Sequence, residues 1–290
     1  MDIQTLAAFK AVAETGSFSK AAQALFLTQP AISKRIATLE AELEVKLLDR
    51  IGRQTLPTHA GKLLLPRAIR ILNEVEESRR QISNLSDAVT GKLTLATSHH
   101  IGLHRLPPVL QAFRQQYPEV QLDLRFMDSE SACQKVESGH IELAIVTLPK
   151  TNDPLLQTQE IWKDPLAFVV SATAPMPAEA LLDLDALSQT AAILPSPNTV
   201  TRKLIEQAFQ DAGLSFDIAM ETNYLETIKK MVEIGLGWSA LPVNMLDERL
   251  KTLDLPQIKI SRSLGIVTHT KRTQTNACIA MCQLLASGKF

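Results

Sequence analysis

The segment that most constrains the fold is residues 18–43, FSKAAQALFLTQPAISKRIATLEAEL, because it holds two amphipathic helical stretches with a very short break between them. Apolar side chains recur at helical spacing in both: Phe18, Ala22 and Leu25 in the first, and Ile32, Ile36, Leu39 and Leu43 in the second. Thr28 is a favourable N-cap, and Pro30 falls in the first turn, where a missing N–H costs nothing. Because residues 26–28 are too few for antiparallel helices, we predict a sharp helix-turn-helix.

The composition of the chain narrows its class. It has 290 residues, of which 45% are hydrophobic and 21% charged, with a formal net charge of −1, as expected for a globular protein of two or three domains. The chain has no run of about 18 apolar residues, so no membrane-spanning helix is predicted. The acid at position 2 makes the N-terminus a poor signal peptide. Three cysteines indicate a reducing compartment, so we expect a cytoplasmic protein.

The residues around this segment predict a winged helix-turn-helix domain over residues 1–58. A helix is expected from Ile3, capped by Asp2, with Gly16-Ser17 ending it and capping the next. The stretch LLDRIGRQTLPT (47–58) has apolar ends around Gly52, which is typical of a short hairpin. Its tip would carry Arg50 and Arg53, within a stretch from Lys46 to Arg70 that holds six basic residues and one acid.

This geometry makes the start of the second helix a candidate DNA-reading element. Gln29 can form paired hydrogen bonds with adenine, Ser33 can meet several base edges, and Pro30 can contact a thymine methyl group. Basic side chains would bind phosphates. The predicted DNA-binding set is Thr28, Gln29, Pro30, Ser33, Lys34, Arg35, Arg50 and Arg53. The alternatives are a plain helix-start role for Gln29 and a salt bridge from Arg35 to Glu40 or Glu42.

A dimerising linker helix is predicted over residues 59–90. Its seam follows coiled-coil spacing and comprises Leu65, Ala68, Leu72, Val75, Arg79 and Ile82, of which Arg79 is the one charged residue. The alternative is a helix packed on its own domain. Pro66 conflicts with a straight helix and should cost about 3 kcal/mol or impose a kink. Two copies of the domain would then read an inverted repeat.

Residues 91–290 alternate short β-rich runs with helices, which predicts parallel βαβ units in two α/β lobes. Lobe I would span about 91–161 and 266–290, and lobe II about 162–265. A cleft is expected between them, at the carboxyl ends of the strands. The start of the helix near Val200 could hold an anion there.

Polar residues at these strand ends form the predicted ligand site for a small organic anion. The set is Ser98, His99, His100, Ser129, Thr147, Pro197, Asn198, Thr199, Asn223 and Tyr224. Helix capping is the alternative for Ser129 and Thr199. His100 and His104 have i, i+4 spacing, but no third ligand is evident, so no metal or other cofactor is predicted. Core packing is favoured over redox sensing for Cys278 and Cys282.

Specific stretches resemble the family of LysR-type transcriptional regulators. GSFSKAAQAL, TQPAISKRIATLE, LLDR and PTHAG match its DNA-binding segment in order and spacing, with departures at Leu48 and Pro57. KVESGHIELAIVT and MVEIGLGWSALP are similar to its effector domains, which look like periplasmic binding proteins.

The resemblance implies a sequence-specific DNA-binding regulator that is controlled by a small metabolite and assembled as a homodimer or homotetramer. Its partners would be double-stranded promoter DNA, the effector and RNA polymerase. The alternatives are a thiol-sensing regulator of the same family and a solute-binding protein. No GxSxG, HExxH, Walker or dinucleotide-binding motif indicates an enzyme.

Overall fold

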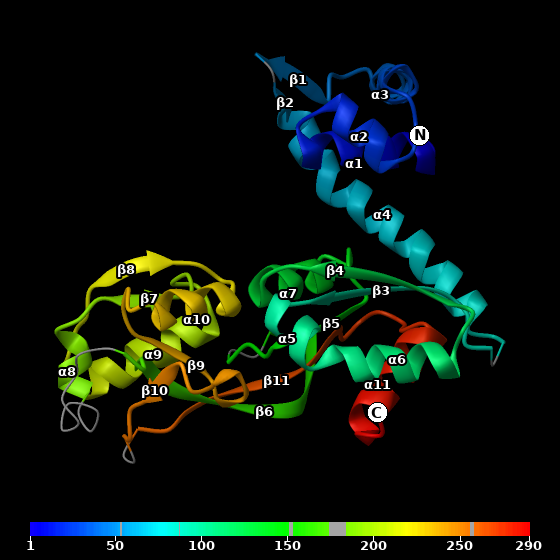
Figure 1. Cartoon of the computed structure of the whole chain (residues 1–290). Helices are drawn as coiled ribbons and strands as arrows, with labels where there is room; N and C mark the ends of the chain where they lie inside the picture. Colours follow the sequence, from blue (N-terminus) through cyan, green and yellow to red (C-terminus); the bar gives the residue numbers. More distant parts are fainter. Residues whose placement is uncertain (53, 87, 151–152, 174–183, 256–257) are drawn as a thin grey trace. The chain divides into compact units, whose positions relative to one another are not determined.

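The chain forms two compact units, Met1–Leu85 and Ser86–Phe290, which are considered separately (Figure 1). The computed structural model describes residues 1–52, 54–86, 88–150, 153–173, 184–255 and 258–290. Among these residues, no helix has both the length and the apolar character needed to cross a bilayer.

The N-terminal unit is the predicted winged helix-turn-helix followed by a long helix. Its elements are α1 (Ile3–Thr15), α2 (Phe18–Ala24), α3 (Gln29–Leu43), the antiparallel hairpin β1 (Leu48–Ile51) and β2 (Gln54–Pro57), and α4 (His59–Ser83). Side chains at the predicted caps accept hydrogen bonds from first-turn N–H groups, as Asp2 does for α1, Thr28 for α3 and Thr58 for α4. Because these signals are local, the observed helix starts agree with those predicted from the sequence.

The apolar faces of the helices meet in one small core. It includes Leu6, Phe9, Val12, Ala22, Ile32, Ile36, Leu39, Leu47 and Ala68. The predicted stripe of α3 is wrong at its end, since Leu43 is 37% exposed in the last turn. A polar side chain, Glu40, is buried there instead.

Helix α4 runs unbroken through Pro66. Pro66 was predicted to cost about 3 kcal/mol or to impose a kink; it is the eighth residue of α4, so the helix continues there without the hydrogen bond that another residue would donate to the Lys62 carbonyl. The predicted seam divides in two. Ala68 is buried and Leu65 and Leu72 pack against the N-terminal core, as in the alternative of a helix packed on its own domain. Farther along, Ile82 is 69% exposed in the isolated chain.

The C-terminal unit is built on two lobes. Lobe I contains β3 (Gly91–Thr97), α5 (His99–His104), α6 (Leu106–Gln116), β4 (Val120–Phe126), α7 (Ser129–Glu137), β5 (Leu143–Thr147) and α11 (Asn276–Ser287). Lobe II contains α8 (Leu184–Ser188), β7 (Ala192–Leu194), α9 (Val200–Asp211), β8 (Ile218–Glu221), α10 (Leu225–Glu233), β9 (Ser239–Pro242), the 3-10 turn η2 (Val243–Met245) and β10 (Leu250–Thr252).

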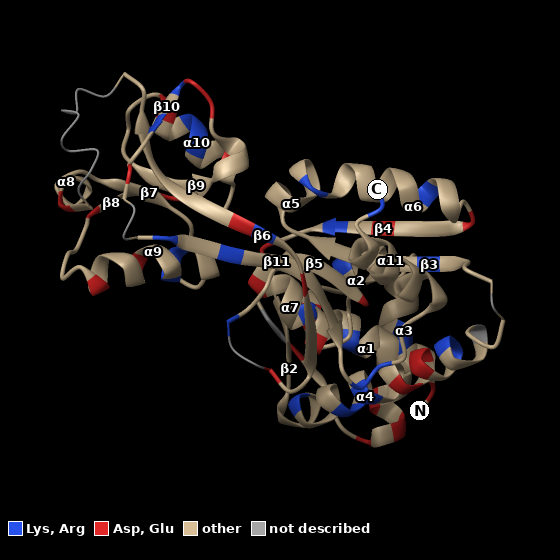
Figure 2. Cartoon of the chain, turned by 90° about the horizontal axis from the view of Figure 1, so that it is seen from below, with Lys and Arg blue, Asp and Glu red and all other residues tan. Residues whose placement is uncertain are grey.

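Two long strands, β6 (Leu156–Ser171) and β11 (Ile260–His269), connect the lobes side by side (Figure 2). They join the sheet of order β10-β6-β11-β5-β3-β4, in which β9 also pairs with β6. The predicted parallel pairing is confirmed for β3 with β4 and β5, and for β7 with β8. Strand β11 runs antiparallel to β5 and β6, because it returns the chain to lobe I beside β6, the strand that left it.

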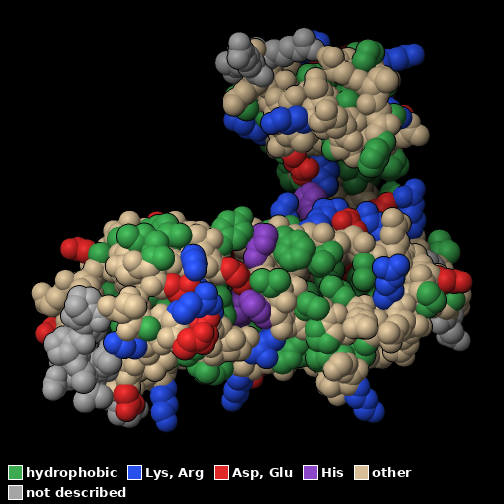
Figure 3. All heavy atoms as spheres, viewed as in Figure 1, with side chains coloured by type: hydrophobic (Ala, Val, Ile, Leu, Met, Phe, Trp, Pro, Cys, Tyr) green, Lys and Arg blue, Asp and Glu red, His purple; other side chains and the backbone are tan. Residues whose placement is uncertain are grey.

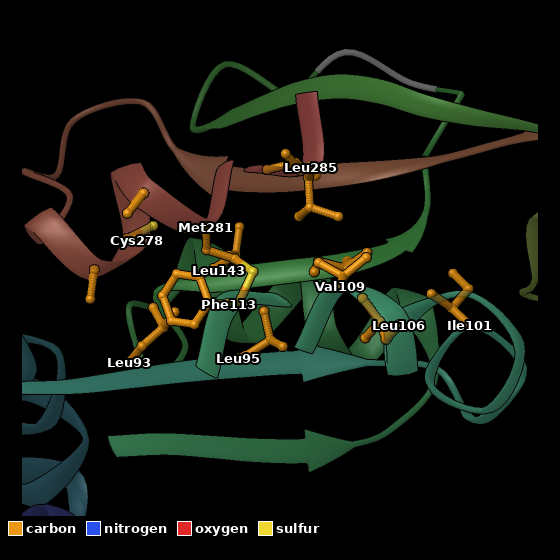
Figure 4. Packing of buried hydrophobic residues seen from close by; sticks show 14 of the residues in the cluster. Leu93, Leu95, Ile101, Leu106, Val109, Phe113, Leu143, Cys278, Met281 and Leu285 are labelled. Carbon is orange, nitrogen blue, oxygen red and sulfur yellow. The ribbon is translucent and has the colours of Figure 1, made fainter. Parts of the chain in front are cut away.

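Each lobe has its own hydrophobic cores. In lobe I, Met281 and Leu285 of α11 and Phe113 of α6 pack with Leu95 of β3 and Leu143 of β5 (Figure 4). In lobe II, Trp238 stacks on Phe209 with ring centroids 5.0 Å apart. Cys278 is buried in the lobe I core, as predicted for a packing residue, and Cys282 packs against that core.

Candidate functional site

The N-terminal end of α3 presents an exposed polar surface. Thr28, Gln29, Pro30 and Lys34 are exposed, whereas Ser33 and Arg35 are half-buried. Thr28 uses its hydroxyl to accept a hydrogen bond from the Ala31 N–H at 3.4 Å, which fixes the first turn. The side chain of Gln29 therefore sits on an ordered helix start.

Two predicted DNA-contact residues, Ser33 and Arg35, are half-buried beside other side chains of the domain. Ser33 lines a groove with Glu40, Lys46 and Asp49, between α3 and the start of the hairpin. Arg35 donates from Nη2 to Gln4 Oε1 on α1 at 2.8 Å, so the alternative pairing with Glu40 or Glu42 is wrong. Glu40 instead binds Lys46, and Glu42 binds the N-terminal amine.

The wing is only partly described. Arg50 lies on β1 opposite Thr55, and the described residues do not include its side chain. Arg53 lies outside the described residues altogether. Gly52 has φ +62, a left-handed conformation that favours glycine at this turn.

A buried carboxylate joins α3 to the wing. Glu40 Oε1 accepts from the N–H groups of Leu47 at 2.8 Å and Leu48 at 3.3 Å, and Oε2 binds Lys46 Nζ at 2.9 Å. Burial acts to raise the pKa of Glu40, but Lys46 and the two amides together hold it below its usual value. The sequence reasoning treated Glu40 only as a partner for Arg35.

In the C-terminal unit, a polar cavity lies between the lobes. Seven predicted residues line it: Ser98, His99, His100, Ser129, Thr147, Thr199 and Asn223. Pro197 and Asn198 are exposed and do not line it, and neither does Tyr224, which is 51% exposed. The strand-end rule therefore identified most of the lining, because both lobes turn their strand ends toward this cavity.

Several lining groups already have partners within the protein. Thr199 caps α9 by accepting from the Arg202 N–H at 3.2 Å, which is the capping role left open for it. Ser129 Oγ accepts from the Thr147 N–H at 3.2 Å, and Asp128 takes the N-cap position of α7. Ser98 occupies the N-cap of α5 without a side-chain capping bond.

Sequence reasoning missed Arg262 of β11, the one arginine among the described residues that line the cavity. Its guanidinium is buried; Nε and Nη2 bind Asp164 of β6 at 2.8 and 2.7 Å, and Nη1 donates to Thr201 Oγ1 at 2.9 Å. Arg105 also approaches Asp164, at 3.4 Å. Arg262 is the one charged residue of β11, and this was the available signal for a buried partner; Asp164 gave no such signal, because Glu160 and Lys163 lie on the same strand.

A carboxylate from lobe I reaches a helix start of lobe II. The Val200 N–H, in the first turn of α9, donates to Glu130 Oε1 at 3.1 Å. This is the helix start predicted to hold an anion, and there an internal carboxylate fills that role.

Beside the cavity, Glu226 of α10 approaches two histidines of α5. Its Oε1 lies 3.0 Å from His104 Nε2 and 3.8 Å from His100 Nδ1. The facing imidazole of His100 lowers the pKa of Glu226 to about 2, with a smaller contribution from His104. Burial lowers the pKa of His100 itself, against the opposing effect of Glu226.

Comparisons with known proteins agree with this architecture. A family model described as bacterial regulatory helix-turn-helix protein, lysR family, matches residues 3–62, and one described as LysR substrate binding domain matches residues 86–288. An uncharacterised HTH-type transcriptional regulator of Azotobacter vinelandii is 64% identical over 108 residues, 37% of this chain and 75% of that protein. A probable RuBisCO transcriptional regulator of Cyanidioschyzon merolae is 30% identical over 291 residues, 97% of this chain and 96% of that protein.

Solved structures share the fold at low identity. A full-length OxyR variant from Pseudomonas aeruginosa has a TM-score of 0.70 at 20% identity, covering 99% of this chain and 94% of that one. CbnR in complex with its target DNA has a TM-score of 0.64 at 21% identity, covering 99% of both chains. With both of its domains matched, the chain belongs to the LysR family and is a transcriptional regulator with an N-terminal helix-turn-helix domain and a C-terminal effector-binding domain.

Proposed function

We propose that this regulator reads an inverted-repeat promoter site through the start of α3 and responds to a small organic anion in the interlobe cavity. The observation that carries the effector class is the carboxylate of Glu130 on the Val200 N–H. An internal carboxylate at this helix start indicates that the site suits such a group.

The DNA-reading part rests on exposure and chemistry. Gln29 is exposed at an ordered helix start and carries an amide that can pair with adenine. Lys34 is exposed one turn later and suits a phosphate. Arg35 is engaged with Gln4, so a phosphate contact by Arg35 would have to replace that bond.

Paired recognition helices require self-association. Three apolar side chains are exposed along this segment: Leu63 and Ile82 of α4 and Leu85, just after its end, at 61%, 69% and 84% exposure. Ile82 belongs to the predicted seam, and Val75 on the same seam is half-buried. We infer a dimer formed through the second half of α4, with tetramers assembled from such dimers, because a second copy there would remove Val75, Ile82 and Leu85 from water.

The effector would compete with Glu130. The cavity volume is about 50 Å³, which holds one or two water molecules, so a metabolite requires Glu130 to withdraw or the lobes to separate. An incoming carboxylate would take the Val200 N–H and lie near Arg262 and the Ser98 hydroxyl. The ligand then acts through its different affinity for the two arrangements of the lobes.

Thiol sensing has less support. Burial, followed by the charges of Glu130 and Asp153, raises the pKa of Cys133 to about 11, which makes its thiol a poor nucleophile at neutral pH. The buried Cys278 belongs to the lobe I core.

We infer that the regulator acts in the cytoplasm, where promoter DNA and RNA polymerase are present, with a metabolite as its signal.

The effector experiment is a thermal-shift screen of two- to eight-carbon carboxylic acids and their neutral amides, with hits measured by calorimetry. Glu130→Gln removes the competing charge and should bind the acid about 3- to 10-fold more tightly. Ser98→Ala should bind it more weakly. Glu137→Gln, on the same helix and exposed, is the matched control. Equal binding of acids and amides, or weaker binding by Glu130→Gln, would contradict the proposal.

The DNA experiment recovers binding sites from genomic fragments and then compares two variants on the recovered site and on random DNA. Gln29→Ala should lose about 1–3 kcal/mol of discrimination while keeping its affinity for random DNA. Lys34→Ala should weaken binding to the recovered site and to random DNA alike. It should also reduce the slope of log affinity against log salt concentration by about one. A uniform loss with Gln29→Ala would refute base reading by this residue.

A further inference from the structure

Three side chains with metal-binding atoms converge at the edge of the interlobe cavity. His100 and His104 lie one turn apart on α5, and Glu226 lies in the first turn of α10. Among the described residues, these three offer ligand atoms that all fall within 4.8 Å of one another. Glu226 supplies the third ligand that spacing alone did not reveal.

The spacing of these atoms suits a small cation. With metal–ligand distances of about 2.0–2.1 Å, neighbouring ligands of a tetrahedral zinc ion lie about 3.3–3.4 Å apart. Glu226 Oε1 is 3.0 Å from His104 Nε2 and 3.8 Å from His100 Nδ1, values on either side of that spacing. The imidazole centroids of His100 and His104 are 4.9 Å apart, and one ligand atom from each of the three side chains falls within 4.8 Å of the other two.

The imidazole of His100 is buried and needs a polar partner. Its side chain is only 4% exposed, and neither ring nitrogen has a hydrogen-bond partner within the described structure. Leaving a buried polar group unpaired costs about 1–3 kcal/mol, so such groups normally bind a protein atom, a water or an ion. The contact to Glu226 at 3.8 Å is too long for a hydrogen bond.

The surroundings leave Glu226 available and reachable. The nearby cations Lys229 and Lys230 bind Asp247 and Glu233, at 2.7 and 2.8 Å, rather than Glu226. His104 and Glu226 are about one-third exposed and line a surface groove, which provides an entry path. Figure 3 shows histidine side chains at the surface of this unit, beside a patch of mixed charge.

We propose that His100, His104 and Glu226 bind one divalent transition-metal ion, for which Zn²⁺ is the best match, and that this ion cross-links the two lobes. Two imidazoles and one carboxylate favour zinc and its neighbours over Mg²⁺ or Ca²⁺, which prefer all-oxygen sites. A fourth position stays open to water. Because the histidines belong to lobe I and Glu226 to lobe II, the ion would oppose separation of the lobes whichever effector binds.

The test uses the untagged full-length chain, stripped with a chelator and titrated with Zn²⁺ against a chromophoric chelator. Wild type should bind one Zn²⁺ per chain, and His104→Gln or Glu226→Gln should weaken binding at least about 100-fold. His99→Gln is the matched control, since His99 is exposed on the same helix outside the cluster. Circular dichroism checks that each variant is folded.

Two further measurements separate a lobe-bridging ion from a simple histidine pair. Co²⁺ in place of Zn²⁺ should give the strong visible absorption of a four-coordinate site in wild type only. Zn²⁺ should raise the Tm of wild type and leave that of Glu226→Gln unchanged. No stoichiometric uptake by wild type, or wild-type affinity in Glu226→Gln, would overturn the proposal and leave the His104–Glu226 contact as an ordinary hydrogen bond.

Discussion

Replacing Glu40 with glutamine tests whether one buried carboxylate fixes the wing to the DNA-reading helix. Glu40 Oε1 accepts from both Leu47 and Leu48, while Lys46 binds Oε2 and is 78% exposed. A pair with so exposed a lysine contributes about 0.2–1 kcal/mol. The amide bonds matter more, because each hydrogen bond to a charged group contributes about 1.5–3 kcal/mol.

The loss in free energy of unfolding depends on which of these hydrogen bonds a glutamine can still accept. Its oxygen can still accept from both amides, but without charge the bonds fall to about half their strength, so Glu40→Gln should cost about 1–3 kcal/mol. Alanine would leave the buried Leu47 N–H without this acceptor and should cost about 3–5 kcal/mol. For a unit of this size, each kcal/mol lowers the Tm by about 4–8 °C.

The assay is calorimetry of the full chain, with hydrogen exchange of peptides covering residues 44–58. Exchange at Leu47 and Leu48 should accelerate in Glu40→Gln, and operator affinity should fall because the wing is released from α3. Glu44→Gln, an exposed position four residues on, is the control. Wild-type exchange rates in Glu40→Gln would refute the inference that the Glu40 carboxylate holds the wing to α3.

The same carboxylate predicts a pH dependence. Because the pKa of Glu40 is lower in the folded chain than in the unfolded one, its stabilisation is fully present above the unfolded value. It is lost as the pH falls through the folded value. The stability difference between wild type and Glu40→Gln should therefore be constant near pH 7 and shrink once the pH drops below about 4.5. If the stability difference between wild type and Glu40→Gln grew on acidification, the pKa of Glu40 would not be lowered by folding.

Three further changes have defined outcomes. Phe26 has φ +54 and is 96% exposed, so Phe26→Asn should raise the free energy of unfolding by about 1 kcal/mol, measured by urea denaturation; a lower value would be contrary evidence. A Cβ at Gly265 would lie 2.0 Å from the Gln159 carbonyl oxygen, so Gly265→Ala should destabilise the C-terminal unit by about 2 kcal/mol or more, and an unchanged Tm would exclude the clash. Val75→Lys with Ile82→Lys should give monomers by light scattering, and persistent dimers would place the interface elsewhere.

The sequence predicted elements that depend on local signals. Thr28 and the apolar spacing of α3 define the recognition helix because capping and amphipathicity act within a few residues. The strand ends that line the cavity follow from a general rule of α/β topology. Side-chain partners were predicted less well, as Arg35 illustrates: Gln4 is its neighbour only once α1 packs against α3.

The groups that sequence reasoning missed are pairs of residues far apart in the chain. Glu226 lies 122 positions after His104, and Arg262 lies 98 positions after Asp164, so no local spacing connects them. The His104–Glu226 pair forms only when the two lobes lie together, whereas Asp164 and Arg262 are directly opposite each other in the antiparallel pairing of β6 with β11. Of these four residues only Arg262 is an isolated charge in a largely apolar strand, which indicates a buried partner without identifying it.

Lobe movement in this chain should cost polar contacts rather than core packing. The hydrophobic clusters divide between the lobes, with Phe113 and Met281 on one side and Trp238 and Phe209 on the other. The contacts described across the cavity are hydrogen bonds and close polar approaches, of which the Glu130–Val200 bond is one. Each is worth about 0.5–3 kcal/mol, which is the scale of energy that a small effector can supply through differential binding. A closed form held by a few such contacts can therefore be shifted by a metabolite, whereas one held by a shared hydrophobic core could not.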